Sequence, residues 1–213
     1  MVASAESGIV EGEDGVRRCW WCDSTPEYRA YHDDEWGLPI SDDIALFENL
    51  SLEGFQAGLS WWTILRKREA FRSAFAGFDL ERVAAFGEED VERMLGDAGI
   101  VRHRGKIEAV IGNAGRVLEL IEAQGSLAAH VWSFEPADPV WARSRSELAE
   151  RPLPDEAKAL SRDLKRRGWR FVGPATVYAF MQAVGMVDDH LDGCAARAGS
   201  EQARAAFERP VAR

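Results

Sequence analysis

Four potential metal ligands are split between the two ends of the chain: Cys19 and His32 lie near the start, and His190 and Cys194 lie near the end. The chain contains only three Cys and four His, so this set uses most of its soft ligands. His190 and Cys194 have the i, i+4 spacing that on a helix places both side chains on one face. Two Cys and two His make the composition of a closed, four-coordinate structural zinc site. A metal bound there would close a long loop, where a cross-link restricts the unfolded chain most in theory.

Cys22 adds a competing interpretation. Cys19-Trp20-Trp21-Cys22 is a CxxC segment, which can be a redox pair, and Cys22 can also compete with Cys19 for the metal. A thiol-redox CxxC usually opens a helix within a βαβ pattern, and no such pattern is visible here. The pattern of residues therefore favours a metal site over a redox protein and leaves the choice between the two Cys open.

The net charge of −10 argues against a protein coated with nucleic acid, but it does not exclude a local basic face. Basic residues gather in two clusters: Arg102, His103, Arg104 and Lys106, and then Lys158, Arg162, Lys165, Arg166, Arg167 and Arg170. The alternative interpretation of both clusters is a solvated helix face.

The bulk composition indicates a cytoplasmic globular protein. Three Cys in 213 residues do not make a disulfide framework, which favours a reducing compartment. The first residues show no signal-peptide pattern, and no run of about 18 apolar residues predicts a membrane span. We expect a monomer with no membrane partner.

Helical periodicity dominates the chain, with no sustained period-two alternation and no hairpin signal. The expected helices cover 41–57, 61–75, 79–86, 88–98, 105–123, 126–132, 155–167 and 174–187. The predicted fold class is therefore all-α.

The domain organisation follows from the less regular segments. Residues 1–16 and 197–213 are predicted to be tails, the first flexible, on either side of one domain at 17–196. Four prolines within 135–154 indicate an irregular connection between two helical subdomains. The pocket is expected between these subdomains.

Glu53 is a carboxylate in a segment that is otherwise apolar. It lies in the apolar helical pattern of 41–57, where a carboxylate is costly to bury unless something pairs with it. One interpretation is an Arg-paired or half-exposed Glu. The functional interpretation is a pocket carboxylate among Tyr31, Trp61 and Trp62.

A glycine-containing turn lies between two helical patterns, at Arg167-Gly168-Trp169-Arg170-Phe171-Val172-Gly173-Pro174. Its glycines allow a tight turn with exposed backbone N–H groups, and the following helix adds the positive end of its dipole. With Lys165 and Arg170 beside it, this turn is suited to bind a phosphate.

Several of these segments together resemble one family. The segments are YHDDEWG (31–37), LEGFQAGLSW (52–61), DAGIVRHRGKIEAVIGNA (97–114) and RFVGPATVYAFMQAVGMVDDH (170–190), followed by Gly193-Cys194. In order and spacing the chain closely resembles the bacterial 3-methyladenine DNA glycosylase I family, within the helix-hairpin-helix glycosylase superfamily. The resemblance covers about residues 17–195.

The resemblance implies a fold, an activity and a set of site residues. It implies an all-α helix-hairpin-helix DNA glycosylase fold in which one structural Zn²⁺ joins the N- and C-terminal segments. It implies hydrolysis of the N-glycosidic bond of 3-methyladenine in alkylated double-stranded DNA. The implied zinc ligands are Cys19, His32, His190 and Cys194; the base-binding residues are Tyr31, Glu53 and Trp61; the DNA-binding residues are Leu59, Lys165, Arg170 and Gly173.

The implied chemistry agrees with these residue types. A base in a duplex must be flipped into a pocket, and a damaged base costs least to extrude. In DNA, 3-methyladenine is cationic and leaves readily, so that aromatic rings and the Glu53 carboxylate can favour it over neutral adenine. No Lys nucleophile stands out, which agrees with a monofunctional, water-driven cleavage.

Two features depart from the family pattern. Cys22 is not part of it, and Asp188 stands where Asn is expected. In the wider superfamily a V-D-x-H stretch carries a catalytic Asp, so Asp188 is a candidate second carboxylate; otherwise it caps a helix end or faces solvent. The alternative functions are a non-catalytic, zinc-stabilised binder of alkylated DNA and a thiol redox protein that uses Cys19 and Cys22.

Overall fold

The computed structural model describes residues 7–137 and 143–211. These residues form two compact units, each made of segments that are distant in the sequence. Unit 1 consists of the described parts of Met1–Ile40, Glu135–Pro154 and Met181–Glu208. Unit 2 consists of the described parts of Ser41–Phe134, Asp155–Phe180 and Arg209–Arg213. Helix α11 (Pro174–Ala183) begins in unit 2 and ends in unit 1.

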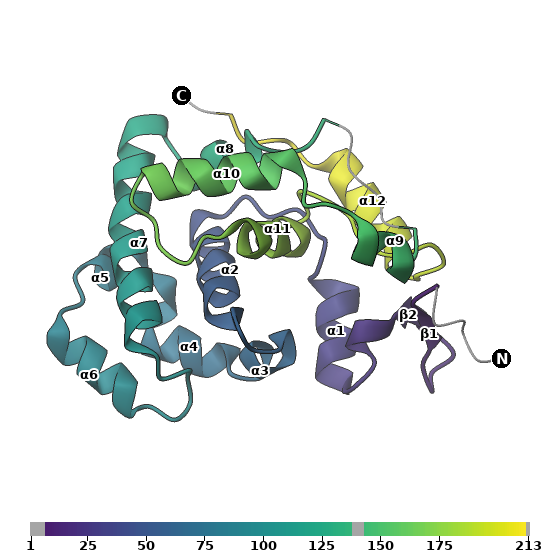
Figure 1. Cartoon of the computed structure of the whole chain (residues 1–213), viewed down its shortest axis with the longest axis horizontal. Helices are drawn as coiled ribbons and strands as arrows, with labels where there is room; N and C mark the ends of the chain where they lie inside the picture. Colours follow the sequence, from purple (N-terminus) through teal and green to yellow (C-terminus); the bar gives the residue numbers. More distant parts are fainter. Residues whose placement is uncertain (1–6, 138–142, 212–213) are drawn as a thin grey trace. The chain divides into compact units, whose positions relative to one another are not determined.

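The regular elements of unit 2 within the described residues are all helices (Figure 1). Its elements are α2 (Asp43–Gln56), α3 (Trp61–Leu65), α4 (Arg68–Ala74), η2 (Ala76–Phe78), α5 (Leu80–Ala84), α6 (Glu88–Gly96), α7 (Arg104–Gln124), α8 (Leu127–Trp132) and α10 (Asp155–Arg166). Helix α7 packs against α2, α5, α6 and α8. It buries an apolar stripe that includes Ile107, Val110 and Val117, as its periodicity predicts.

The helix expected over 61–75 is two helices in the structure. Helix α3 ends at Leu65 and α4 begins at Arg68. Between them, the Lys67 ammonium donates to the carbonyls of Ala98, at 2.8 Å, and Gly99, at 3.0 Å. This tertiary anchor coincides with the break, which the apolar periodicity alone does not reveal.

Unit 1 contains a short β-hairpin that the sequence analysis did not predict. Its described elements are β1 (Ile9–Glu11), β2 (Arg17–Cys19), η1 (Trp20–Cys22), α1 (Pro26–Asp34), α9 (Arg145–Glu150) and α12 (Arg197–Ala206). Strands β1 and β2 are antiparallel, with Ile9 opposite Cys19. Three residues per strand are too few to give a period-two signal.

Regular structure also occurs where tails and a connection were expected. Strand β1 lies within 1–16, and α12 lies within 197–213, where Ser200 and Arg204 are buried. Helix α9 lies within the proline-rich segment 135–154, of which residues 138–142 are outside the described residues. The predominantly helical class is nevertheless confirmed. No helix in the described residues is both long and apolar enough to cross a membrane.

Helix α11 ends earlier than expected, at Ala183 instead of residue 187. Gly185 adopts φ +73°, and the N–H of Met186 donates to the carbonyl of Met181, which is the pattern of a Schellman C-cap. A Cβ on Gly185 would lie 2.6 Å from the backbone of Leu38 and Pro39. The expectation that His190 and Cys194 share a helix face is therefore wrong, because both follow this stop.

Candidate functional site

The two end segments of the chain meet at a buried Cys₂His₂ cluster in unit 1. Ligand atoms of Cys19, His32, His190 and Cys194 all lie within 4.8 Å of one another, and all four residues are buried. The Cys194 sulfur is 3.5 Å from His32 Nε2 and 3.6 Å from His190 Nδ1. Tetrahedral zinc with ordinary Zn–S and Zn–N bonds gives an S···N separation of about 3.6 Å. The donor set therefore fits a four-coordinate metal ion.

Local structure explains how each ligand reaches the cluster. Cys19 ends strand β2, and His32 lies near the end of α1, whose N-cap Thr25 accepts a hydrogen bond from the N–H of Tyr28. On the other side, a tight turn closes with the N–H of Cys194 donating to the carbonyl of Leu191. His190 and Cys194 thus meet through this turn and not through a helix.

The outer ring nitrogens of both His have partners. His32 Nδ1 lies 2.8 Å from Asp33 Oδ1, and Arg18 in turn donates to Asp33 at 2.8 and 3.0 Å. His190 Nε2 lies 3.1 Å from the carbonyl of Trp36. A metal-ligating His usually has such a partner, which fixes the tautomer and the ring orientation.

Cys22 is not part of the cluster. Its sulfur donates to the carbonyl of Cys19 at 3.1 Å, and burial raises the pKa of its thiol to about 12. A raised pKa works against a reactive thiolate, so the geometry does not support the redox interpretation. By contrast, hydrogen bonds from Cys19, and then from His190 and His32, lower the pKa of Cys194 against the effect of burial.

Glu53 lies on α2 in unit 2 and is 5% exposed, and Leu50, Leu52 and Phe55 of the same helix are buried too. Within the described part of the chain, no hydrogen bond or ion pair reaches its carboxylate, and burial alone raises its pKa to about 8. The neighbouring Glu48, on the same helix, is instead paired with Arg72 at 2.8 Å. The Arg-paired interpretation of Glu53 is therefore wrong.

The other predicted base-binding residues are placed as follows. Trp61 opens α3, directly after its N-cap Ser60, and is half-buried in unit 2. Tyr31 is buried on α1 in unit 1, with its ring centroid 6.5 Å from that of Trp21.

Leu59 lies in the loop between α2 and α3 and is 40% exposed. The loop turns at Gly58, with φ +87°, and is closed by the N–H of Leu59 donating to the carbonyl of Gln56 at 2.7 Å. The Gln56 side chain donates back to the carbonyl of Leu59 at 2.8 Å. This closed loop presents an apolar side chain to solvent.

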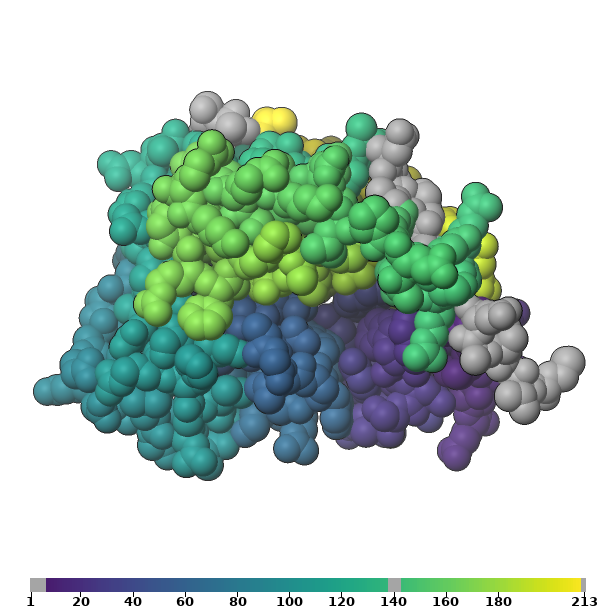
Figure 2. All heavy atoms as spheres, viewed as in Figure 1, coloured from purple at the N-terminus to yellow at the C-terminus, as the bar shows by residue number. Residues whose placement is uncertain are grey.

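The predicted hairpin joins α10 to α11. Lys165 and Arg170 are exposed, whereas Trp169 and Val172 anchor the turn in the core. Gly173 directly precedes α11. In the space-filling view, α10 and the turn after it lie at the visible surface (Figure 2).

The first basic cluster is less basic than its sequence suggests. Arg104 is paired with Glu88 and Glu92, and Lys106 is buried on α7, where burial lowers its pKa. In the second cluster Arg166 and Arg167 share Asp163.

Asp188 is fully buried in unit 1, which excludes the interpretation that it faces solvent. Its Oδ1 accepts a hydrogen bond from the N–H of His190 at 2.9 Å. Asp188 therefore supports the turn that leads to a metal-ligand position.

Comparisons with known proteins identify the family. Residues 21–198 match the family model described as methyladenine glycosylase. The chain is 49% identical over 187 residues to DNA-3-methyladenine glycosylase 1 of Escherichia coli (strain K12), covering 87% of this chain and 100% of that relative. The crystal structure of a 3-methyladenine DNA glycosylase I has a TM-score of 0.78 at 49% identity, covering 84% of this chain and 98% of the other.

A further crystal structure holds a ligand. It is of a Tyr-to-Phe variant of 3-methyladenine DNA glycosylase I in complex with 3-methyladenine, with a TM-score of 0.76 and 39% identity over 82% of this chain and 94% of the other. The helical fold and these matches define a DNA glycosylase fold. The chain belongs to the methyladenine glycosylase family.

Proposed function

We propose that the protein is a monofunctional DNA glycosylase that removes 3-methyladenine from alkylated double-stranded DNA. The observation that carries the proposal is the buried, unpaired carboxylate of Glu53 in a chain of this family. Desolvation of a carboxylate is costly. An unpaired carboxylate on a buried helix therefore indicates a ligand that hydrogen-bonds to it or carries the opposite charge. We further propose that the enzyme acts as a monomer in the cytoplasm.

In the proposed reaction the damaged nucleotide is first flipped out of the duplex. The bond between C1′ and the cationic base then breaks, and the base leaves as neutral 3-methyladenine with the bonding electrons. Water adds to C1′ and releases a proton. Because the leaving group is already cationic, its departure needs no strong general acid, and a Glu53 carboxylate can favour the cationic base over neutral adenine.

We propose Tyr31 and Trp61 as base-binding residues that act through aromatic contacts. Aromatic faces attract a desolvated cation by about 2 kcal/mol, which neutral adenine does not gain. Shape and charge then discriminate together.

Contacts to DNA are proposed for the loop and the hairpin of unit 2. The exposure of Leu59 on a closed loop supports its insertion into the gap that the flipped base leaves. Exposed Lys165 and Arg170, which precede the backbone of Gly173 and the start of α11 in the chain, suit a phosphate group.

We propose Zn²⁺ as the ion held by Cys19, His32, His190 and Cys194. Two sulfur and two nitrogen donors, all buried, support this choice, with the Cys194 sulfur at tetrahedral separations from both His nitrogens. Zinc bound by all four has no open position, so it contributes stability to unit 1 and no reaction step.

Asp188 is proposed as a second carboxylate that stabilises the developing positive charge on the sugar. Its burial and its hydrogen bond from the His190 N–H also suit a purely structural role. Asp188→Asn separates the two: a tenfold or larger loss of base release in a folded, metal-replete protein supports catalysis, and full activity removes the idea.

The deciding experiment measures free base released from methylated duplex DNA by chromatography. Wild type should release 3-methyladenine, and Glu53→Gln should release it at least about a hundredfold more slowly, as for loss of one electrostatic contact to the transition state. Glu48→Gln is the matched control, because Glu48 lies on the same helix but is paired with Arg72. If wild type binds methylated duplex yet frees no base, the non-catalytic binder is correct.

A further inference from the structure

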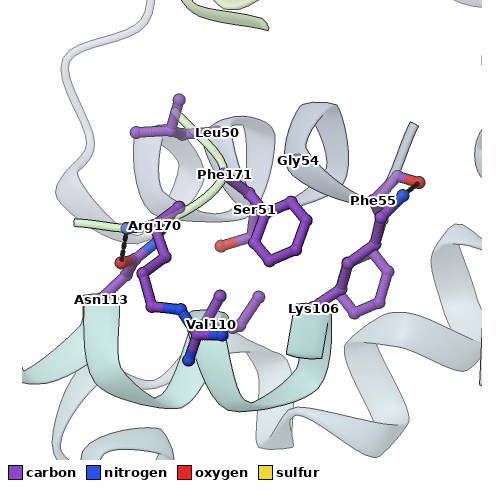
Figure 3. Close-up of a pocket in the computed structure, with 10 residues that line it drawn as sticks. Leu50, Ser51, Gly54, Phe55, Lys106, Val110, Asn113, Arg170 and Phe171 are labelled. Atoms are coloured by element: carbon purple, nitrogen blue, oxygen red, sulfur yellow. Dashed lines mark hydrogen bonds between the residues drawn. The ribbon is translucent and has the colours of Figure 1, made fainter. Parts of the chain in front are cut away.

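Two residues of α7 hold the backbones of two other segments of unit 2. Lys106 and Asn113 are seven residues apart, which is two helical turns, so their side chains leave the same face of α7. Figure 3 shows both residues at the small pocket that they line together with residues of α2 and of the hairpin. Neither residue belongs to the base-binding set proposed above.

Lys106 binds the end of α2. Its side chain is 7% exposed, and its ammonium donates to the carbonyl of Phe55 at 2.8 Å (Figure 3). The same ammonium donates to the carbonyl of Ala57 at 2.7 Å. The last carbonyls of a helix have no partner within the helix, so a cation there satisfies them. Leu59 follows two residues later, and its loop therefore starts from the point that Lys106 fixes.

Asn113 binds the hairpin. Its Nδ2 donates to the carbonyl of Arg170 at 3.0 Å, and its Oδ1 accepts from the N–H of Arg170 at 3.0 Å (Figure 3). One amide side chain thus satisfies both backbone groups of this residue. The next residue, Phe171, has φ +56°, a left-handed conformation that is costly for an aromatic residue and needs support from its surroundings.

The hairpin also contacts α2 directly. A Cβ on Gly54 would meet the Cβ of Phe171 at 3.4 Å and its carbonyl oxygen at 3.5 Å, so the glycine permits a close approach. The Phe171 ring centroid lies 6.0 Å from the Lys106 ammonium. The loop, the hairpin and α7 therefore meet around Lys106.

We infer that Lys106 and Asn113 are positioning residues that hold the Leu59 loop and the phosphate-binding hairpin at a fixed separation along α7. This inference rests on the DNA contacts assigned to Leu59 and the hairpin under the proposed function. When Leu59 enters the base stack, its position relative to the hairpin must match the distance between that stack and the phosphate that the hairpin binds. Helix α7 is hydrogen-bonded to the end of α2 through Lys106 and to the hairpin through Asn113. It can therefore keep the loop and the hairpin in position without contacting the base itself.

The test uses a duplex that contains a tetrahydrofuran abasic analogue, which has a gap in the stack but no base to cleave. Lys106→Met should weaken binding of this duplex at least tenfold. Binding of free 3-methyladenine, measured by calorimetry, should stay within twofold of wild type. A variant that merely damaged the fold would lose both. Lys67→Met is the matched control, because Lys67 also binds two backbone carbonyls, those of Ala98 and Gly99, and should leave duplex binding within twofold.

A second measurement asks whether Lys106 acts through Leu59. Leu59→Ala should weaken duplex binding in the wild-type background and change it less than twofold in the Lys106→Met background, because coupled residues are not additive. For the hairpin, Asn113→Asp keeps the acceptor and loses the donor, so it should weaken binding less than Asn113→Leu. If Lys106→Met does not fold, Lys106→Arg, which keeps the charge and the donors, and the Asn113 pair provide the same comparison.

Two results would overturn the inference: a folded Lys106→Met protein that binds the duplex within twofold of wild type, or additive effects of Lys106→Met and Leu59→Ala. Failure of the proposed function would give a different result. The wild-type protein would then bind the abasic duplex but release no base from methylated DNA.

Discussion

The Cys₂His₂ cluster of unit 1 and Glu53 of unit 2 are both buried, but their polar atoms are arranged in opposite ways. In unit 1, the Cys₂His₂ side chains face one another, and their outer atoms are held by Asp33 and by the carbonyl of Trp36. In unit 2, the Glu53 carboxylate is buried on α2, with no partner in the described residues. The first arrangement is complete once a metal ion is bound, whereas the second is complete only with a ligand. A buried polar group whose partners are all present thus indicates a structural role. A buried polar group without a partner indicates a functional role.

The largest effect should come from breaking the site in unit 1. Cys194→Ser should lose stoichiometric zinc, measured by elemental analysis, and lower Tm by more than 10 °C. Structural zinc sites contribute on the order of 10 kcal/mol in isolated domains. Cys22→Ser is the control, because Cys22 lies outside the cluster. Zinc retained at wild-type affinity in Cys194→Ser would contradict the assignment.

The next effect concerns the stability of unit 2. The pKa of Glu53 is about 8 in the folded protein against a reference of 4.5, so between these values the folded state holds a proton that the unfolded chain has lost. The free energy of unfolding therefore falls as pH rises through this window, by up to about 5 kcal/mol. Glu53→Gln should be increasingly more stable than wild type from pH 5 to pH 8 in urea unfolding. An equal difference at both pH values would contradict the unpaired carboxylate.

The same group should control the pH dependence of base release. If ionised Glu53, with its pKa of about 8, recognises the cationic base, kcat/KM should rise about fiftyfold from pH 6 to pH 8 and only about twofold more above pH 8, since kcat/KM reports the free enzyme. Glu48→Gln should keep this slope, and Glu53→Gln should lose it. A flat wild-type profile over this range would argue against an ionised Glu53 in the reaction.

The smallest effect should come from the support around the metal ligands. Asp33→Asn should weaken zinc affinity by about tenfold to a hundredfold in competition with a chelator, because Asp33 orients His32. Asp14→Asn is the control: Asp14 pairs with the same Arg18 but does not contact the cluster. Equal losses in both variants would place the effect in Arg18 and not in the His32 contact.

The sequence was sufficient for the helical class, most helix positions and the membership of the metal set. Apolar periodicity over many residues is a strong signal, and scarce Cys and His leave few possible combinations. It was not sufficient for the β-hairpin, because strands as short as Ile9–Glu11 carry no periodic signal. The stop at Gly185 was also missed, since it depends on the close approach of Leu38 and Pro39 from far along the chain.

Lys106 shows a further limit of the sequence. It stood in a basic cluster and was interpreted as part of a surface, yet it is buried against the end of α2. One signal was available: its neighbour Ile107 begins the apolar stripe of α7, so a long side chain at 106 lies at the border of the buried face. What it binds could not be inferred, because backbone carbonyls such as those of Phe55 and Ala57 leave no mark in the sequence.

The four metal ligands are synthesised as two pairs, one near the start of translation and one near its end. His32 and Cys194 are separated by 162 positions. At ordinary translation speeds the first two ligands therefore wait roughly 10–30 s for the last two. During that interval the nascent chain exposes an incomplete thiol–imidazole half-site. With Zn²⁺ as the proposed ion, zinc supply should act on newly made chains, whose half-site is still open, before it acts on folded protein, whose four ligands are buried.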